Sequence, residues 1–349
     1  MTNAYARAGV DTGAADRAVE ALVGVLRTID TGRAARTVPL PGHYAAVLAV
    51  APNLGIAVGT DGVGSKLIVA EQTGRYDTVG IDCVAMNVND VVCVGAEPIA
   101  VLDYLAVEET DADVFAAVAR GLKAGAEDAG VEIPGGEVAV LPELIRGHPS
   151  PGGLDLTAAC FGTVALDAIV SGAACAPGDA LIGLPSSGLH SNGYTLARRA
   201  LEPLGLEARP AALGGASVAD ALLEPTVIYV RAVLDLLRSG LPVHGLAHIT
   251  GGGLANLRRL STAVGFAVEA PLPVPAVFGL VAAGADVAAE EMWRVFNMGC
   301  GFCAVVPEHA AADAVAVLAA RHPGTARIGT VTADAGSVSV PTLGVELPR

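Results

Sequence analysis

Apolar runs and amphipathic segments alternate along almost the whole chain. Runs such as residues 54–61 and 98–108 are rich in Val, Ile, Leu and Ala, and Gly, Asp or Pro interrupt them. That length and composition indicate buried strands. Strands are also expected at residues 131–145, with a break at Gly135-Gly136, and at residues 153–170, as one long strand or a pair; helices are expected within the first 40 residues and at 65–72, 82–94 and 114–129, with Gly130 as a stop.

The alternation begins again after a Pro-Gly-Asp turn at residues 177–179. We therefore place a domain boundary near residue 170, with one domain at residues 1–170 and a second at residues 171–349. Repeated alternation in both halves predicts α/β or α+β layers. In the second half, strands are expected at residues 180–184, 243–250, 265–270, 301–307 and 326–331, and helices after Gly193 and Gly253 and over 218–238 and 308–321.

Composition and charge narrow the class of protein. The chain has 349 residues, of which 52% are hydrophobic, and a mean hydropathy of +0.55. No uninterrupted run of about 18 apolar residues exists, so we expect no membrane partner. The net charge of −15 argues against nonspecific binding to nucleic acid. An anionic small substrate must then be held by local donors or by a metal.

The cysteines indicate the cellular compartment. Six cysteines without a recognisable signal peptide predict reduced thiols and a cytoplasmic location. Cys300 and Cys303 form a C-x-x-C motif, which can be a redox or metal site. Because a second C-x-x-C and a thioredoxin-like context are both absent, we interpret them as small apolar residues of a buried strand.

The segment at residues 59–67, GTDGVGSKL, places glycines and an acidic residue between a strand and a helix. It is similar to a Walker A loop but does not match the order G-x-x-x-x-G-K-[ST]. Glycines let the backbone approach an anion, and a helix N-terminus offers free N–H groups. Asp61 is a residue type that holds Mg²⁺, and Lys66 is one of only two lysines in the chain. The segment predicts a phosphate site; the alternative is a glycine-rich turn with a surface lysine.

The helix expected at residues 82–94 carries polar residues among Val, Cys and Met. Asp82, Asn89 and Asp90 share one helical face or its edges. A carboxylate among apolar neighbours is costly unless it is paired or bound to a metal. We therefore expect a metal or nucleotide contact at Asp90. For Asp82 two interpretations remain, a contact of the same kind or a salt bridge.

Glu137 follows two consecutive glycines. Flexible backbone at that point could position a metal ligand or a base. The same residues also form ordinary turns, so both interpretations stay open.

The segment at residues 185–198, PSSGLHSNGYTLAR, concentrates hydroxyl, amide and imidazole groups between a strand and a helix. Ser191 and Asn192 are residue types that cap a helix. His190 can donate, accept or transfer a proton near neutral pH. We interpret the segment as a substrate pocket; the alternative is a capping loop with an exposed histidine.

A further glycine-rich turn follows the strand expected at residues 243–250. Thr250 precedes Gly251-Gly252-Gly253, and such a turn at a helix start can bind an anion. The pattern G-x-G-x-x-G with a following ribose-binding acid is absent, so a dinucleotide site is not indicated.

Ten segments between Tyr5 and Gly301, read in order, resemble the phosphoribosylformylglycinamidine cyclo-ligase family of purine biosynthesis, also called aminoimidazole ribonucleotide synthetase. The segments D-G-V-G-S-K and S-S-G-L-H-S-N-G are specific when they occur together. The wider superfamily includes formylglycinamidine ribonucleotide synthetase, selenophosphate synthetase, thiamine-monophosphate kinase and a hydrogenase maturation factor. The segments are YARAGVD, TDGVGSK, IDCVAMNVND, GAEP, LDYLA, PGGE, SSGLHSNGYTLAR, PTVIYV, HITGGG and RVFNMGCG.

The resemblance implies an ATP-dependent ring closure with ATP and Mg²⁺ as cofactors. ATP phosphorylates the formyl amide oxygen of formylglycinamidine ribonucleotide, the amidine nitrogen attacks the activated carbon, and phosphate leaves as the imidazole ring closes. The implied catalytic residues are Lys66 and His190, and the implied metal ligands are Asp61, Asp90 and Glu137. The implied nucleotide contacts are Asp61, Gly62, Gly64, Ser65, Lys66, Asp82, Asn89 and Asp90, with Lys66 on a phosphate. The implied substrate contacts are Ser187, His190, Ser191, Asn192, Thr250, Gly251, Gly252 and Gly253, of which Thr250 to Gly253 would help to bind the substrate phosphate.

The resemblance also implies an architecture. The family has two α/β domains, a β-rich N-terminal domain that pairs with its copy into a dimeric β-barrel and a C-terminal α/β sandwich. The expected protein is a cytoplasmic homodimer that acts on a small nucleotide. Three segments depart from the family pattern: residues 17–28 lack a lysine, residues 40–48 read LPGHYAAVL instead of a Gly- and Phe-rich segment, and Val138 stands where relatives have a threonine.

Two other functions are alternatives to the cyclo-ligase. One is a different ATP-phosphorylating member of the superfamily, such as a kinase or an amidotransferase subunit. The other is a catalytically silent ATP-binding homologue. The S-S-G-L-H-S-N-G segment favours the cyclo-ligase, and the reactive Cys or Sec expected near the N-terminus of a selenophosphate synthetase is missing.

Overall fold

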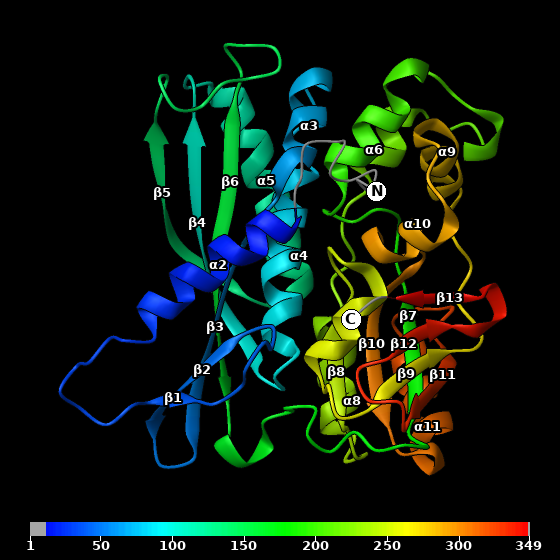
Figure 1. Ribbon diagram of the computed structural model, residues 1–349. Helices are drawn as coiled ribbons and strands as arrows, with labels where there is room; N and C mark the ends of the chain where they lie inside the picture. Colours follow the sequence, from blue (N-terminus) through cyan, green and yellow to red (C-terminus); the bar gives the residue numbers. More distant parts are fainter. Residues whose placement is uncertain (1–11, 348–349) are drawn as a thin grey trace.

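The computed structural model describes residues 12–347, so the YARAGVD segment at residues 5–11 lies outside the described residues. Two sheets stand side by side, each with its own helices (Figure 1). Strands of residues 37–164 form one sheet, and strands of residues 180–347 form the other. The prediction of a mixed α/β fold with two domains is therefore confirmed.

The N-terminal sheet has the strand order β1-β2-β3-β6-β4-β5, in which only β4 and β5 are parallel neighbours. Its elements are β1 (Thr37–Val38), β2 (Ala46–Ala51), β3 (Leu54–Gly62), α3 (Leu67–Thr73), α4 (Val79–Val92), β4 (Glu97–Val107), α5 (Ala112–Ala129), β5 (Glu132–Val140) and β6 (Leu154–Val164). Along β6, buried residues alternate with more exposed ones, which is the pattern of a strand with one covered face. Helices α4 and α5 lie against that face (Figure 1).

The opposite face of this sheet is open and apolar. Leu48, Val50, Ile99, Leu102 and Tyr104 are exposed on it. Their chain neighbours Val47, Val101 and Leu105 are buried, as the two-residue period of a strand requires. An open apolar face of this kind indicates an interaction surface.

The C-terminal sheet has the order β13-β12-β9-β11-β7-β10-β8. Its strands are β7 (Ala180–Pro185), β8 (Gly245–His248), β9 (Gly265–Val268), β10 (Cys300–Val306), β11 (Ala326–Thr332), β12 (Val338–Val340) and β13 (Val345–Leu347). Its helices are α6 (Tyr194–Leu201), α7 (Val218–Leu223), α8 (Val230–Arg238), α9 (Ala276–Ala285), α10 (Ala289–Val295) and α11 (Ala311–Ala319), with the 3₁₀ helix η5 (Gly253–Arg259). Every residue of β10 is buried, which places this strand inside the domain core.

The helix predicted at residues 218–238 is wrong in one respect, because the structure divides it into α7 and α8. Pro225 lies between them; it has no N–H, and it restricts the preceding residue to extended backbone. The linking segment, residues 224–229, runs along α4 of the other domain and bonds to its polar side chains.

Other boundaries also differ from the prediction. β5 continues through Gly135-Gly136 without a break, because pairing with β4 holds both glycines in extended backbone. Residues 154–164 form one long strand. The turns after Val63 and Gly252 begin as 3₁₀ helix, and α4 begins at Val79.

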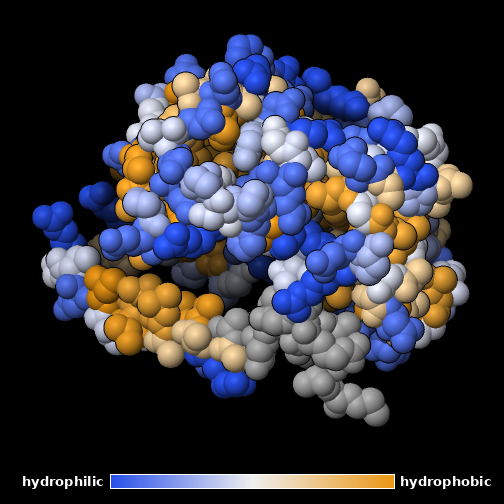
Figure 2. Space-filling view, turned by 90° about the horizontal axis from the view of Figure 1, so that it is seen from above, coloured by the Kyte–Doolittle hydropathy of each residue, from blue (hydrophilic) through white to orange (hydrophobic). Residues whose placement is uncertain are grey.

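The N-terminal helix α2 (Thr12–Leu26) stands apart from both sheets. Its side chains Val19, Leu22 and Leu26 are more than half exposed, although their spacing would suit a buried helix face. Figure 2 shows this apolar patch on the surface of the molecule. Within residues 12–347, no helix combines the length and hydropathy that crossing a membrane requires.

Candidate active site between the two domains

The end of β3 places Asp61 against α4. The Asn87 side chain accepts the Asp61 N–H at 2.9 Å and donates to Asp61 O at 3.0 Å, so the backbone here is held from both sides. The Gly62 N–H donates to Asp61 Oδ1 at 2.7 Å. Burial raises the pKa of the Asp61 carboxyl; the Gly62 hydrogen bond opposes this shift, and the charge of Asp90 adds to it. A partly buried carboxylate with incomplete compensation is suited to bind a cation.

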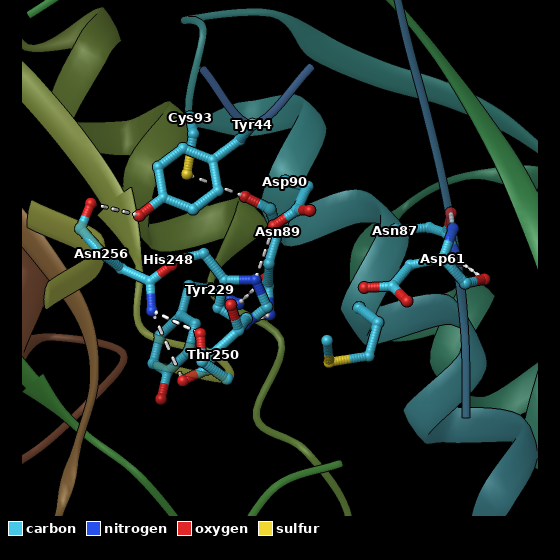
Figure 3. Close-up of polar contacts among 12 residues, drawn as sticks. Tyr44, Asp61, Asn87, Asn89, Asp90, Cys93, Tyr229, His248, Thr250 and Asn256 are labelled. Carbon is cyan, nitrogen blue, oxygen red and sulfur yellow. Dashed lines mark hydrogen bonds and ion pairs between the residues drawn. The ribbon is translucent and has the colours of Figure 1, made fainter. Parts of the chain in front are cut away.

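Asp90 faces the C-terminal domain from the same helix. Its Oδ1 lies 2.8 Å from Nδ1 of His248, the last residue of β8 (Figure 3). His248 is fully buried, whereas the Asp90 side chain is 18% exposed. The histidine thus holds one carboxylate oxygen, and the side chain keeps some exposed surface.

Asn256 organises the turn at residues 250–253. Its Nδ2 lies 3.5, 3.0 and 2.8 Å from the carbonyl oxygens of Thr250, Gly251 and Gly253. Because these carbonyls turn inward, the N–H groups of Gly251 and Gly252 face outward. Gly252 has a φ of 94°, which favours glycine, and it is exposed. The turn has the geometry of an anion-binding backbone concavity.

Lys66 and Asp82 are placed differently from the nucleotide contacts expected for them. Lys66 Nζ lies 2.7 Å from Asp82 Oδ2, and both side chains are fully buried. The ammonium also donates to the carbonyl oxygens of Glu224 at 2.7 Å and His190 at 3.2 Å, which uses all three of its N–H bonds. Asp82 accepts the N–H and the hydroxyl of Thr226 at 2.8 and 2.6 Å. In this arrangement neither side chain reaches a phosphate, and the pair joins the two domains.

The ionisation of this pair is set by burial. Burial lowers the pKa of Lys66 and raises that of Asp82, and the attraction between the two charges opposes both shifts. A buried ion pair is therefore worth little in net stability, but removal of one partner leaves an uncompensated charge.

Asn89, another expected nucleotide contact, also serves the domain interface. Its Nδ2 donates to Val227 O at 2.8 Å, and its Oδ1 accepts the Tyr229 N–H at 2.9 Å. Both ends of the carboxamide are thus used, and the residue is fully buried. Asn89 therefore fixes the linking segment 224–229 on α4.

His190 occupies a left-handed backbone conformation with a φ of 60°, which is uncommon for a residue other than glycine. The Ser187 N–H donates to its Nε2 at 3.4 Å, so the proton lies on Nδ1, which is buried without a partner. Burial lowers the pKa of His190 well below its usual value, and His248 and Lys66 add to this effect. The imidazole is therefore neutral, and it is almost completely buried.

The acidic turn of the N-terminal domain meets the Ser- and Asn-rich loop of the C-terminal domain. Ser191 Oγ donates to Val63 O at 3.0 Å, and Ser65 Oγ lies 3.4 Å from Thr195 Oγ1. The structure thus brings together two segments that lie more than 120 residues apart in sequence.

The other residues of that loop are also engaged. Ser187 Oγ donates to Pro225 O at 2.6 Å, and Asn192 Nδ2 lies 3.9 Å from Met86 Sδ of α4. The expected capping by Ser191 or Asn192 is wrong: α6 is preceded by Gly193, whose φ of 73° starts the helix without a side-chain cap. Asn192 is only partly buried, so its amide can still bind a ligand.

The glycines of the acidic turn have different roles. A Cβ at Gly62 would lie 2.9 Å from Thr157 Cγ2, so the space at this position disfavours any larger residue. Gly64 has open space around it, but its φ is 69°, so a residue with a side chain would be strained there by the backbone conformation. Of these two glycines, only Gly64 is exposed.

Glu137 lies away from the other predicted metal ligands. The sheet register aligns Glu137 with Tyr104, Thr157 and Gly62 on successive strands. Asp61, one residue earlier, points to the opposite face of the sheet, and the three strand spacings amount to about 14 Å. Among residues 12–347, no group of three His, Cys, Asp or Glu side chains could hold a metal ion. The predicted trio is therefore not assembled within one chain.

The C-x-x-C motif lies inside the core. Cys300 and Cys303 are buried free thiols with their sulfur atoms 3.5 Å apart. Burial in β10 agrees with the interpretation of the motif as part of a buried strand.

Sequence reasoning gave no site role to four residues that support the site: Tyr44, Asn87, His248 and Asn256. Each is buried and polar or aromatic, and each contacts a segment that was recognised (Figure 3). Asn87 and His248 lie inside the quoted segments IDCVAMNVND and HITGGG, so their polarity among apolar neighbours was the available signal.

The chain matches the AIR synthase related protein family in both halves. Residues 42–164 match the N-terminal domain of that family, and residues 176–340 match its C-terminal domain. The phosphoribosylformylglycinamidine cyclo-ligase of Thermococcus gammatolerans is 47% identical over 347 residues, which cover 98% of this chain and 99% of the relative. That of Methanothermobacter thermautotrophicus is 47% identical over 336 residues, 95% of each chain.

Solved structures with the same fold are more distant in sequence. Hydrogenase maturation protein HypE in complex with ATP has a TM-score of 0.61 at 23% identity and covers 88% of each chain. AaThiL complexed with AMPPCP and TMP has a TM-score of 0.61 at 18% identity, covering 87% of this chain and 89% of the other. At these identities the likeness concerns the fold alone.

Proposed function

The chain belongs to the AIR synthase related family of phosphoribosylformylglycinamidine cyclo-ligases, and we propose that the site between its two domains carries the ring closure. The enzyme forms a C–N bond at the expense of ATP in purine biosynthesis. The observation that carries this conclusion is the 47% identity over 98% of the chain to a cyclo-ligase of the same length. The HypE and ThiL structures, which hold ATP and AMPPCP, support nucleotide binding by this fold.

The reaction requires a poor leaving group to become a good one. The formyl amide oxygen of formylglycinamidine ribonucleotide takes the γ-phosphoryl group of ATP, which releases ADP. The amidine nitrogen then attacks the activated carbon, and phosphate leaves with the former amide oxygen as the imidazole ring closes. The protein has to align the two reactants and stabilise the charge of the transferring group.

Asp61 and Asp90 are the residues that fit a magnesium ion. Mg²⁺ is commonly held by one or two carboxylates together with substrate phosphates and water. Both carboxylates have exposed surface, and the pKa of Asp61 is raised by burial, so a cation would relieve an unfavourable charge. When bound, the ion would neutralise charge on the phosphates of ATP.

Thr250 to Gly253 and Asn192 are proposed to face the substrate. The outward N–H groups of Gly251 and Gly252 can donate to a substrate oxygen, and Asn256 keeps them oriented. Asn192 lies beside this turn, because its Oδ1 would be 3.2 Å from a Cβ on Gly251. The turn and the amide thus form one hydrogen-bonding surface.

His190 is the proposed proton-transfer residue. It is neutral, its Nδ1 proton has no acceptor, and its backbone is held in the left-handed region with a φ of 60°. Lys66 is proposed to act indirectly, because it holds the His190 carbonyl rather than a phosphate.

We also propose a cytoplasmic homodimer formed through the open face of the N-terminal sheet. Leu102 and Tyr104 lie on this face, and water contact with so large an apolar surface is unfavourable. Glu137 shares the row of Tyr104. It would therefore serve a metal only in the site of the partner subunit. Six free, buried thiols suit a reducing compartment.

Incubation of the purified protein with ATP, Mg²⁺ and formylglycinamidine ribonucleotide tests the function. We expect equimolar ADP and aminoimidazole ribonucleotide. ADP without the imidazole product would indicate another phosphorylating activity, and neither product would indicate a silent ATP-binding protein.

Light scattering tests the dimer. The wild type is expected at twice the chain mass of 34.8 kDa, and Leu102→Glu at the monomer mass, because a charge on the open face opposes its burial. Glu109→Lys, which changes an exposed charge outside the sheet, is the control. A wild type at the monomer mass would refute the dimer.

A further inference from the structure

One cation near the interdomain site has an aromatic ring as its partner instead of a carboxylate. The guanidinium carbon of Arg259, at the end of η5, lies 4.8 Å from the centre of the Tyr44 ring. Arg75 and Arg321, by contrast, are paired with Asp220 and Asp235. No carboxylate of residues 12–347 lies within ion-pair distance of Arg259. Stacking orients the guanidinium and leaves its N–H edges available for an anion.

The ring that carries Arg259 is itself fixed. Tyr44 is buried, and its hydroxyl donates to Asn256 O at 3.1 Å (Figure 3). Asn256 is the residue that orients the turn at residues 250–253. Arg259 thus stacks on a ring that is bonded to the residue orienting the proposed substrate turn, and this contact reduces the side-chain entropy that binding an anion would cost.

His43 supplies an unused donor at the same place. The Tyr44 N–H donates to His43 Nδ1 at 3.0 Å, so the proton lies on Nε2. That Nε2 is buried without a partner, a situation that costs about 1–3 kcal/mol. Burial and the charge of Arg259 lower the pKa of His43 to about 4, with Asp90 opposing them. At neutral pH His43 is therefore an uncharged donor.

His43 and Arg259 line one cavity of about 360 Å³. Ser171, Ser261 and Thr262 add hydroxyl groups to its wall, and none of the lining residues is acidic. The absence of a carboxylate there is notable in a chain with 36 Asp and Glu residues and a net charge of −15. The cavity, which we name the Arg259 pocket, is a local electropositive site in an acidic protein.

We propose that the Arg259 pocket binds the 5′-phosphate of the ribonucleotide substrate. The proposal rests on the proposed function, which brings two phosphorylated reactants to one site. Asp61 and Asp90 are assigned to the phosphates of ATP, so the second reactant needs a cation of its own. The turn at residues 250–253 offers backbone dipoles without net charge, whereas Arg259 offers a full charge in bidentate geometry. The segment LPGHYAAVL, which departs from the family pattern, supplies His43 and Tyr44 for this pocket.

The variants Arg259→Ala and Arg259→Lys test the pocket by steady-state kinetics. We expect Arg259→Ala to raise KM for formylglycinamidine ribonucleotide by about 10- to 100-fold, since a hydrogen bond to a charged group is lost. KM for ATP should stay within about twofold, and Arg259→Lys should fall between Ala and wild type, because a point charge replaces the bidentate fork. Arg120→Ala, which removes an exposed arginine on α5, is the charge-matched control and should resemble wild type.

Calorimetric titration with ribose 5-phosphate provides a measurement without turnover. Wild type and Arg120→Ala are expected to bind it, and Arg259→Ala to lose binding. His43→Phe keeps an aromatic ring and removes the donor; a smaller, roughly three- to tenfold loss is expected. This variant keeps the proposal testable if Arg259→Ala fails to fold.

Two results would overturn the proposal. One is unchanged binding of ribose 5-phosphate with an unchanged KM for the ribonucleotide in a folded Arg259→Ala protein. The other is a rise in KM for ATP alone, which would assign the pocket to the nucleotide triphosphate. A wild type that makes no aminoimidazole ribonucleotide would refute the function, whereas loss of ribose 5-phosphate binding in Arg259→Ala would still support the pocket.

Discussion

Asp82 and Asp90 lie on the same helix, yet their surroundings are opposite. Asp82 is fully buried and has a lysine and a threonine as partners. Asp90 is partly exposed, and only one of its oxygens is held, by His248. Eight residues correspond to about 80° of rotation around a helix, so the two side chains face different parts of the C-terminal domain. Asp82, whose oxygens are paired with protein groups, joins the two domains. Asp90, which has a protein partner for only one oxygen, can still bind a ligand.

The same contrast extends to the two regions around these carboxylates. At the domain interface, the Lys66 ammonium donates all of its N–H bonds to protein groups. The nitrogen and the oxygen of the Asn89 carboxamide are both bonded to protein groups. In the site, Asp61, His43 and Arg259 keep unused donors or exposed charge. Polar groups without partners cost stability, so the unpartnered His43 Nε2 and the partly exposed Asp61 carboxylate are groups that a ligand can complete.

The largest effect is expected in the site. Asp61→Asn should lower kcat by about 10³-fold, because the charge that holds the cation is lost. The free energy of unfolding should stay equal or rise slightly, since burial raises the pKa of Asp61 and the amide removes that unfavourable charge. Turnover and urea unfolding measure the two quantities. Asp155→Asn, an exposed residue of β6, is the control, and near-normal turnover in Asp61→Asn would refute the metal assignment.

The interface should respond in the opposite way. Lys66→Met leaves Asp82 as an uncompensated buried charge and should reduce the free energy of unfolding by about 3–5 kcal/mol. Urea denaturation measures this loss. The double variant Lys66→Met/Asp82→Asn should recover part of it, because no charge is then left buried. A stable Lys66→Met protein with a raised KM for ATP would contradict this assignment and would support the phosphate contact that the sequence predicts for Lys66.

His190 lies on the border between the two regions and sharpens the comparison. His190→Ala should lower kcat by about 10²-fold through loss of proton transfer, while Mg²⁺–ATP binding measured by calorimetry is retained. His190→Gln keeps a donor and should recover little activity, because it cannot exchange a proton. If both variants lost only stability and kept kcat, the histidine would belong to the interface alone.

The smallest effect is expected on the open face. Glu137→Gln should lower kcat by about tenfold, as for a peripheral metal ligand. Mixed refolding of Glu137→Gln with Asp61→Asn tests where Glu137 acts. If it serves the partner subunit, each mixed dimer contains one intact site, and activity should exceed that of either parent. Activity no higher than that of the parents would place Glu137 in its own chain or outside the site.

The sequence by itself determined which segments matter. Hydrophobic periodicity located most strands and helices, because side-chain burial repeats every two or 3.6 residues wherever an element packs on a core. Glycine-rich turns with an adjacent acid, histidine or threonine were recognised for a related reason: close backbone approach requires residue types that are visible one position at a time. The departure at Gly135-Gly136 arose where pairing with β4 overrode local preference. The division at Pro225 is a local effect of proline, which hydrophobic periodicity alone does not register.

Only the tertiary structure decided the task of each residue within those segments. Lys66 and Asp82 have the chemistry of a phosphate site, but α4 and the segment at residues 224–229 surround them and use all their bonds. Arg259 and Tyr44 lie more than 200 residues apart, and nothing in their local sequence relates them. A side chain's role depends on which partners remain unused after folding, and that quantity is set by long-range packing, which a single sequence does not display.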